Sequence, residues 1–294
     1  SPTAAATLFG LVDTGELFAS EDAGATWTAR STLPARDAIG LAARSSSTEL
    51  CVASRSGTVY RSLDGGFTWT AVDAVPASDV TDIAVTPDLG VLVLTATGAL
   101  YKSTDLGSGF TAIAALTGSN FVSLALTAPT VRLYVLTTTG EVSESADGGA
   151  SWVVKGAIPV SNAVELRSLG TVLYVLTSTG DMHRSTDQGA SWVAVGTLSQ
   201  SGMTALARDG TALVAGTAAG EVARSADGAS WTWQGVINQL TVTALATDAP
   251  ATTGVEGPSA PELRILATPW PNPAREGAAL HLSFRLAREA FAQR

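Results

Sequence analysis

Residues 20–27 read Ser-Glu-Asp-Ala-Gly-Ala-Thr-Trp, and this pattern occurs six times along the chain. It consists of a serine, an aspartate two positions later, a glycine, and a final aromatic residue. The aspartates of the six copies are Asp22, Asp64, Asp105, Asp147, Asp187 and Asp227. Successive aspartates lie 40 to 42 residues apart. A period of this length is typical of one four-stranded blade of a β-propeller.

Each repeat contains four short apolar segments separated by turn residues. In the second repeat we predict strands at residues 39–42, 50–53, 58–62 and 68–72. Glycine always lies between the second and third segments: Gly15, Gly57, Gly98, Gly140, Gly180 and Gly220. Glycine readily adopts the positive φ that a two-residue hairpin needs, so each of these positions is predicted to be a tight hairpin.

The phase of the repeats predicts how the propeller closes. The chain begins in the middle of a blade, at residues 7–10, without an inner strand before it. After the sixth copy, residues 241–246 (Thr-Val-Thr-Ala-Leu-Ala) match the inner strand at 203–207. This surplus strand must complete the first blade, which removes unpaired sheet edges. The prediction is an all-β, six-bladed propeller over residues 1–248, closed by its last strand.

Composition excludes several classes of partner and cofactor. The formal net charge is −9, which disfavours nucleic acid or an anionic membrane surface. No apolar run reaches the roughly 20 residues of a membrane span. The single cysteine, Cys51, excludes an intramolecular disulfide and occupies a predicted core position. No Cys/His cluster has the spacing of metal ligands, so no cofactor is expected. The alternative is Ca²⁺ bound at a ring of oxygen-bearing side chains near one channel mouth.

The repeated pattern, Ser-x-Asp-x-Gly-x-x-Trp, resembles the Asp-box (BNR) repeat of a family of β-propellers, and the resemblance covers residues 1 to about 248. That family includes sialidases, xyloglucanases, sortilin-type receptors and Ycf48-like photosystem assembly factors, so the resemblance implies a fold rather than an activity. We interpret the six aspartates as structural, because a turn aspartate accepts bonds from nearby backbone N–H groups. The third copy ends in Phe110 instead of tryptophan, and the sixth is one residue shorter, which predicts a distorted turn.

Short loops favour a binding module over an enzyme. The loops on the face opposite the repeated aspartates are short and similar in length, whereas catalytic pockets are usually built from long loops. The Arg-Ile-Pro motif of sialidases is absent from the sequence. We therefore expect a non-catalytic propeller that binds protein or glycan. The alternatives are a glycoside hydrolase of the sialidase or xyloglucanase type, and a Ycf48-like assembly factor that binds an acidic partner through Arg61, Lys102, Arg184 and Arg224.

Two features are candidate binding sites. Four consecutive blades have an oxygen-bearing side chain just before the inner strand, and two more follow three residues later: Asp37, Asp79, Asn120, Asn162, Asp82 and Glu165. By pseudo-symmetry they form a ring at one channel mouth, which predicts a site for a cation or sugar, unless they only cap turns. Trp233 stands where other blades have alanine or valine. It either fills space at the closure seam or under the tail, or is a platform for sugar stacking.

The tail is a separate region. Residues 249–262 are rich in proline and glycine and are predicted to be a linker. Within 263–294, a Pro-Asn-Pro at 271–273 precedes the alternating segment 280–286. This resembles the start of type IX secretion C-terminal sorting domains, without their second half. The resemblance implies a bacterial protein that is secreted or attached to the cell surface. A lone strand needs a partner, so chain-to-chain contact through it is the alternative.

Overall fold

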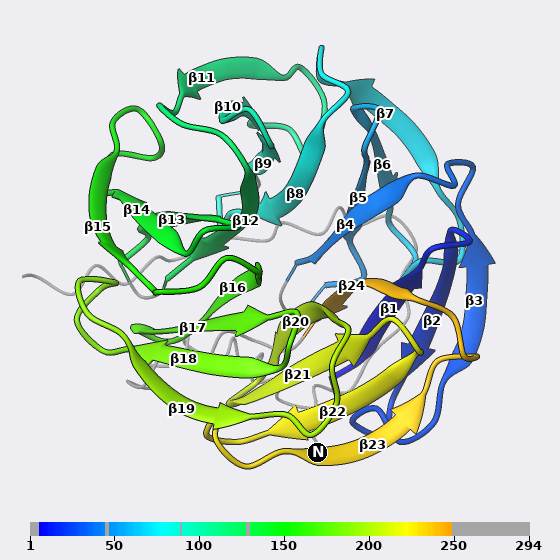
Figure 1. The fold of residues 1–294 in the computed structure, drawn as a ribbon. Coiled ribbons are helices and arrows are strands. Elements are labelled where there is room, and N and C mark those ends of the chain that lie inside the picture. Colours follow the sequence, from blue (N-terminus) through cyan, green and yellow to red (C-terminus); the bar gives the residue numbers. More distant parts are fainter. Residues whose placement is uncertain (1–5, 45–46, 89, 128–129, 249–294) are drawn as a thin grey trace, which may run out of the picture. The chain divides into compact units, whose positions relative to one another are not determined.

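The computed structural model describes residues 6–44, 47–88, 90–127 and 130–248, and these form six four-stranded antiparallel sheets around a central channel (Figure 1). The predicted six-bladed β-propeller is confirmed. The chain divides into two compact units, Ser1–Val255 and Glu256–Arg294. The linker and sorting segment predicted at 249–294 lie outside the described residues.

Every blade runs from an inner strand at the channel to an outer strand at the rim. Blade 1 consists of β24 (Val242–Thr247), β1 (Leu8–Val12), β2 (Glu16–Ser20) and β3 (Thr28–Thr32). Blade 2 consists of β4 (Ala38–Ala43), β5 (Leu50–Ser54), β6 (Thr58–Ser62) and β7 (Thr70–Ala74). Blade 3 consists of β8 (Val80–Val85), β9 (Val91–Thr95), β10 (Ala99–Ser103) and β11 (Thr111–Ala115).

The remaining blades repeat this order. Blade 4 consists of β12 (Phe121–Leu126), β13 (Leu133–Thr137), β14 (Glu141–Ser145) and β15 (Val153–Ala157). Blade 5 consists of β16 (Ala163–Leu169), β17 (Val172–Thr177), β18 (Asp181–Ser185) and β19 (Val193–Thr197). Blade 6 consists of β20 (Met203–Asp209), β21 (Ala212–Thr217), β22 (Glu221–Ser225) and β23 (Thr232–Val236).

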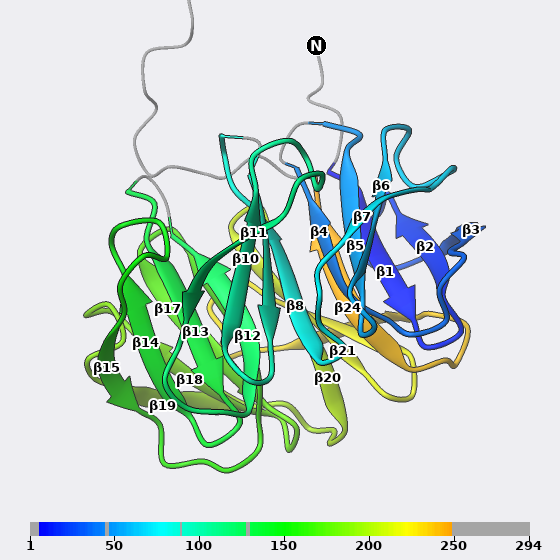
Figure 2. The ribbon, with the colours of Figure 1, turned by 90° about the horizontal axis from the view of Figure 1, so that it is seen from above.

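The ring closes within blade 1, as the repeat phase predicts. Strand β24 pairs antiparallel with β1 from Leu8↔Thr247 to Leu11↔Ala244, and the two strands lie side by side in Figure 2. Beyond the last pair, the N–H of Thr7 donates to the side chain of Asp248 at 2.8 Å. The first and last described strands are therefore hydrogen-bonded to each other, although more than 200 residues separate them.

The outer strand of blade 2 begins later than the sequence predicts. In blade 2 the fourth strand starts at Thr70 rather than at residue 68. The reason is that the backbone N–H of Thr68 donates to Asp64 at 2.9 Å, which keeps Thr68 in the preceding turn. The repeated motif thus extends two residues into the segment that looked like strand.

Apolar residues fill the six interfaces between neighbouring blades. Each interface holds one buried cluster with side chains from both blades. Gly66 shows how closely the blades approach: its φ is 87°, and a Cβ there would collide with Leu17 of blade 1. Cys51 is buried as predicted, and burial raises the pKa of its thiol to about 12.

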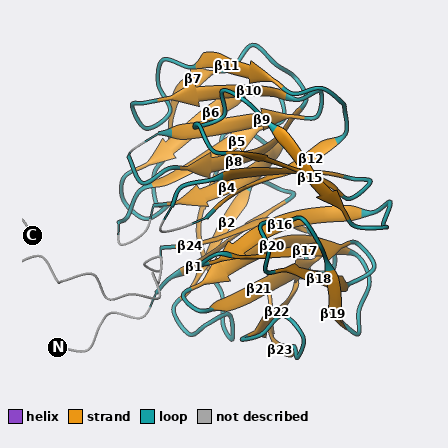
Figure 3. Ribbon diagram, turned by 90° about the vertical axis from the view of Figure 1, so that its left-hand side faces the viewer, coloured by secondary structure: helices purple, strands orange, loops and turns teal. Residues whose placement is uncertain are grey.

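The propeller has two distinct faces. The repeated Ser-x-Asp turns lie on one, which we call the turn face, together with the connections from inner to second strands. The glycine hairpins and the blade-to-blade loops lie on the other, the hairpin face. Figure 3 shows strands joined by loops throughout. Among the residues that the structure describes, no helix could span a membrane.

Candidate functional site

The repeated turns share one hydrogen-bond pattern. In the first, the Ser20 hydroxyl donates to Asp22 at 2.8 Å and accepts the N–H of Gly24 at 2.8 Å. Asp22 also accepts the N–H of Thr26 at 2.8 Å and its hydroxyl at 2.6 Å. The indole N–H of Trp27 donates to the Gly24 carbonyl at 3.0 Å. These donors, led by the Thr26 hydroxyl, lower the pKa of Asp22 to about 2, so the carboxylate is committed to its own turn.

Equivalent bonds form around Asp64, Asp147 and Asp187, whose pKa values are also lowered to about 2. The third turn differs, because Gly109 replaces the hydroxyl residue that donates to the aspartate. Asp105 accepts a bond from the Ser108 hydroxyl at 2.9 Å. The N–H of Gly109 instead donates to Asp73 of β7 in the neighbouring blade, at 2.8 Å.

The shortened sixth turn is distorted, as predicted. Asp227 accepts the N–H groups of Ala229 and Ser230, both at 2.8 Å, instead of an N–H and hydroxyl from one residue. Trp231 still donates to the Gly228 carbonyl at 3.1 Å. The turn therefore keeps three donors on its aspartate with a different set of atoms.

Four of the ring residues bond to hairpins of their own blades on the hairpin face, three through their side chains and Asn120 through its main-chain carbonyl. They are Asp37, Asp79, Asn120 and Asn162. Asp37 accepts the N–H of Ser56 at 3.0 Å, and Asp79 accepts the N–H of Thr97 at 3.0 Å. Asn162 donates to two hydroxyls of its hairpin, and the Asn120 carbonyl accepts the N–H of Thr138. Within the described ranges, no group of three or more His, Cys, Asp or Glu residues could hold a metal ion. Ligand binding at this ring stays a prediction.

The other two ring residues come together in the channel wall. Arg167 lies between them: its Nη2 is 2.6 Å from a Glu165 oxygen and its Nη1 is 3.4 Å from an Asp82 oxygen. The Ser123 hydroxyl lies 3.2 Å from both carboxylates. We call these four residues, Asp82, Ser123, Glu165 and Arg167, the channel cluster; they come from the inner strands of blades 3, 4 and 5.

Burial governs the electrostatics of the channel cluster. The side chains of Asp82, Glu165 and Arg167 are 6, 12 and 20% exposed. Burial raises the pKa of Glu165 from 4.5 to about 8; the Arg167 guanidinium opposes the shift and the Asp82 carboxylate adds to it. Glu165 is therefore mostly protonated at neutral pH. The cluster then carries one negative and one positive charge, so it is close to neutral.

The channel cluster also joins blades through the backbone. A β-bulge near the start of most inner strands changes the register there, for example between Ala163 and Glu165. The N–H of Leu124 donates to Asp82 at 2.8 Å, and the N–H of Leu166 donates to Ser123 at 3.1 Å. Each of these two polar side chains thus accepts a hydrogen bond from a backbone N–H on the inner strand of the next blade. Buried backbone N–H groups require such partners.

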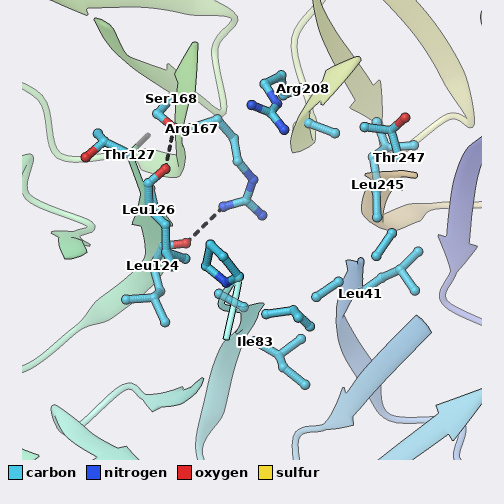
Figure 4. A pocket seen from close by; sticks show the side chains of 18 residues that line it. Leu41, Ile83, Leu124, Leu126, Thr127, Arg167, Ser168, Arg208, Leu245 and Thr247 are labelled. Atoms are coloured by element: carbon cyan, nitrogen blue, oxygen red, sulfur yellow. Dashed lines mark hydrogen bonds between the residues drawn. The ribbon is translucent and has the colours of Figure 1, made fainter. Parts of the chain in front are cut away.

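A cavity opens at each end of the channel. The one toward the hairpin face has a volume of about 340 Å³ and is lined by Arg55, by threonines and by Asp82, Glu165 and Arg167. The one toward the turn face has a volume of about 230 Å³ (Figure 4). Arg167 lines both cavities, so the channel cluster stands between them.

The turn-face cavity contains an unpaired guanidinium. Arg208, on β20, lines it and is partly buried, and within the described part of the chain its side chain has no hydrogen bond or ion pair. Burial lowers its pKa, but an arginine remains charged at any physiological pH. Figure 4 shows Arg208 and Arg167 on one side of the cavity and Leu41, Ile83 and Leu245 on the other.

Trp233 lies on outer strand β23, at the interface of blades 5 and 6. It packs against the cluster that contains Tyr174 and Met182, and its indole N–H donates to the Ser199 hydroxyl at 3.2 Å. This interface is not the closure seam, where β24 pairs with β1. Its ring fills space between two blades, and stacking against a sugar stays a prediction.

Sequence reasoning missed Ser123, Arg167 and Arg208. The sequence signal that could have found the two arginines appears when the six inner strands are aligned with one another, starting at the residue before each strand. Arg167 then stands where the other five blades have alanine: Ala42, Ala84, Ala125, Ala207 and Ala246. Arg208 stands where the others have Ala43, Val85, Leu126, Ser168 and Thr247. A charged residue among small or apolar counterparts marks both.

No protein-family model matches the sequence, and no curated protein matches it. The similarities are to solved structures. A chain in the crystal structure of a nidogen/laminin complex aligns with a TM-score of 0.70 and 13% identity, over 83% of this chain and 99% of that one. A structure of Ycf48 bound to a D1 peptide aligns with a TM-score of 0.52 and 19% identity, over 79% and 82%. Ycf48 from Cyanidioschyzon merolae aligns with a TM-score of 0.50 and 17% identity, over 79% and 86%. At these identities, the likeness shows that the chain shares the propeller fold.

Proposed function

We propose that this protein is a non-catalytic recognition propeller of the Asp-box type, secreted or held at the cell surface, that binds a protein ligand through the turn-face mouth of its channel. One observation carries the proposal: Arg208 is a charged, partly buried donor in an open cavity, and no side chain that the structure describes pairs with it. Leaving a charge desolvated and unpaired costs stability. A ligand that pairs with it recovers that cost.

The carboxylates of the channel, by contrast, already have partners. Asp82 and Glu165 contact the same guanidinium and the same hydroxyl. A glycoside hydrolase needs two carboxylates that flank a sugar, about 5 to 9.5 Å apart. Hydrolysis stays the second candidate for one reason: the pKa of Glu165, about 8, is raised in the direction expected of a general acid.

The fold neighbours support a protein ligand more than a glycan. The nidogen/laminin structure is a protein complex, and one Ycf48 structure contains a peptide. The basic residues of the Ycf48-like alternative differ in availability: Arg224 pairs with Asp209 at 3.1 Å, while Arg184 is exposed. Arg184, an exposed member of that stripe, serves as the control for an acidic partner bound there.

The test compares Arg208→Gln with Arg184→Gln in the full-length chain. Both variants and the parent are applied to peptide and glycan arrays and to chromogenic glycosides. The proposal expects array binding that Arg208→Gln loses and Arg184→Gln keeps, and no glycoside cleavage. Binding that depends on Arg184 alone would favour the acidic-partner alternative. Cleavage that Glu165→Gln abolishes would establish a hydrolase and overturn the proposal.

We further propose that residues 263–294 direct the protein to the cell surface, on the resemblance of 271–286 to a sorting segment. In a host with type IX secretion, a chain ending at Asp248 should fold but remain inside the cell. Immunoblots of surface, medium and cell fractions measure this. Equal surface amounts with and without the tail would show that the tail does not carry the address.

A further inference from the structure

The turn-face cavity offers one strong hydrogen-bond donor. Two nearby hydroxyls are already used, because Thr127 donates to the Thr130 carbonyl and Ser168 donates to the Leu126 carbonyl. Arg167 donates to the carbonyls of Leu124 and Leu166 as well as to the channel cluster. Arg208 is the lining guanidinium for which the described residues provide no acceptor. Any acceptor it binds must come from outside the described residues.

The charge at this mouth suits a singly charged anion. Arg208 adds one positive charge, and the channel cluster beneath it is close to neutral while Glu165 holds its proton. The whole chain has a net charge of −9, which disfavours multiply charged anions such as phosphate. A guanidinium binds a carboxylate through two parallel hydrogen bonds. In this pair the single positive charge of the arginine is balanced by the single negative charge of the carboxylate.

The cavity wall combines apolar residues with polar ones such as Thr127, Arg167 and Ser168. Leu41, Ile83 and Leu245 contribute to the wall from three other inner strands (Figure 4), each only 2–3% exposed, together with alanines of the inner strands. Binding sites for drug-sized molecules usually measure about 300 to 1,000 Å³. A cavity of about 230 Å³ is therefore sized for a single small apolar group beside the anion.

Resting on the proposed function, we propose that the turn-face cavity binds a carboxylate carried on a small aliphatic group, with Arg208 pairing with the carboxylate and the leucine and isoleucine wall holding the aliphatic part. Two sources share this chemistry: the C-terminal residue of a peptide with an aliphatic last side chain, and a free short-chain fatty acid. Both present one negative charge next to about four to six apolar carbons.

The probes separate charge from shape. N-acetyl-leucine has both features, N-acetyl-leucinamide keeps the shape without the charge, and acetate and inorganic phosphate have charge without the aliphatic group. Binding to the full-length protein is measured by isothermal titration and by the shift in melting temperature. We expect N-acetyl-leucine to bind with a dissociation constant of about 1 mM or tighter, and the other three at least about tenfold more weakly.

The variants test the residue. Arg208→Gln should weaken binding of N-acetyl-leucine about tenfold or more, which corresponds to about 1.4 kcal/mol. The variant should fold at least as stably as the parent, because it removes an unpaired, partly buried charge. Arg184→Gln, at an exposed position of β18, should bind as the parent does. Ile83→Ala should weaken N-acetyl-leucine and leave the weak binding of acetate unchanged.

Three results would overturn the proposal: equal binding of N-acetyl-leucine and its amide, phosphate binding at least as tightly as the carboxylate, or full affinity in Arg208→Gln. Comparing acetyl-glycyl-glycyl-leucine with hexanoate identifies the source of the carboxylate. Tighter binding of the peptide indicates a peptide C-terminus, and tighter binding of hexanoate indicates a fatty acid; either result supports the shared chemistry. The proposed protein-binding function is refuted by different results from those that refute the carboxylate site. An array ligand bound through another face would refute the turn-face location even if N-acetyl-leucine binds, and loss of small-molecule binding alone would leave an Arg208-dependent protein ligand standing.

Discussion

Removing Arg167 should destabilise the propeller by an amount that depends on pH. The side chain has two buried carboxylate partners, at 2.6 and 3.4 Å, and donates to two backbone carbonyls. Breaking a buried ion pair by deleting one partner costs about 3–5 kcal/mol. At neutral pH Glu165 keeps its proton, so Arg167→Ala should cost about 3 kcal/mol, the lower end of that range.

The cost should rise above the pKa of Glu165. In the parent, Glu165 loses its proton at about pH 8 because Arg167 stabilises the anion. Without Arg167 the folded state must keep the proton, and each further pH unit then costs about 1.4 kcal/mol. Arg167→Ala should therefore be about 1.0 kcal/mol more destabilising one pH unit above that pKa than at it. Urea unfolding, followed by circular dichroism at both pH values, measures the difference.

Two further variants make the reasoning refutable. The double variant Glu165→Ala with Arg167→Ala copies blade 6, which has Ala205 and Ala207 at these positions, and should be more stable than Arg167→Ala alone at high pH. Arg184→Ala, in the same blade but exposed, should change stability by less than about 0.5 kcal/mol. A cost of Arg167→Ala that does not change with pH, or a double variant as unstable as the single, would refute the argument.

Three other predictions follow from the fold. The repeated aspartates have folded pKa values near 2, so they contribute stability that is present above about pH 4 and lost as the pH falls toward about 2. Measuring the melting temperature against pH tests this. A melting temperature that stays constant across that window would contradict it. Asp147→Ala should lower the melting temperature more than Asp105→Ala. The reason is that Asp147 accepts bonds from both the N–H and the hydroxyl of one residue, while Asp105 accepts its turn bond from one hydroxyl. Equal effects would mean that these bonds do not hold the turns. Deleting residues 241–246 removes most of the strand that closes blade 1, and should give insoluble protein or a large loss of cooperative unfolding; a deletion variant that melts within a few degrees of the parent would refute the closure.

The calcium hypothesis for the hairpin-face ring has a direct test. The carboxylates of Asp37 and Asp79 bond to hairpins of their own blades. If they only cap, millimolar Ca²⁺ should leave the melting temperature unchanged, and Asp37→Ala with Asp79→Ala should lower it equally with and without Ca²⁺. A rise with Ca²⁺ that the double variant abolishes would establish a metal site.

The repeat period and its phase were enough to predict the blades, their number and the closing strand, because each blade is a local unit whose turns recur at fixed positions. The start of the outer strand of blade 2 was mispredicted by two residues, since a threonine has high strand propensity but Thr68 is held by Asp64. Tertiary bonding overrode the local preference there.

The site could be predicted only in part. Asp82 and Glu165 were singled out by position, but their partners were not, because contacts across three inner strands depend on bulges that a pattern of residue types does not reveal. Whether a guanidinium is paired is also a property of the packed channel. Arg167 and Arg208 look alike in sequence, yet one has two carboxylate partners and the other has none among the described residues.

The most direct test of the account is to map where N-acetyl-leucine binds on the full-length protein. Methyl groups of leucine, isoleucine and valine are labelled, and their NMR shifts are followed during titration. The account predicts saturable shifts at Leu41, Ile83 and Leu245 of the turn-face cavity, and none at Val153 or Val193 on the exposed outer strands. Shifts confined to the outer strands, or to the hairpin-face cavity, would contradict it.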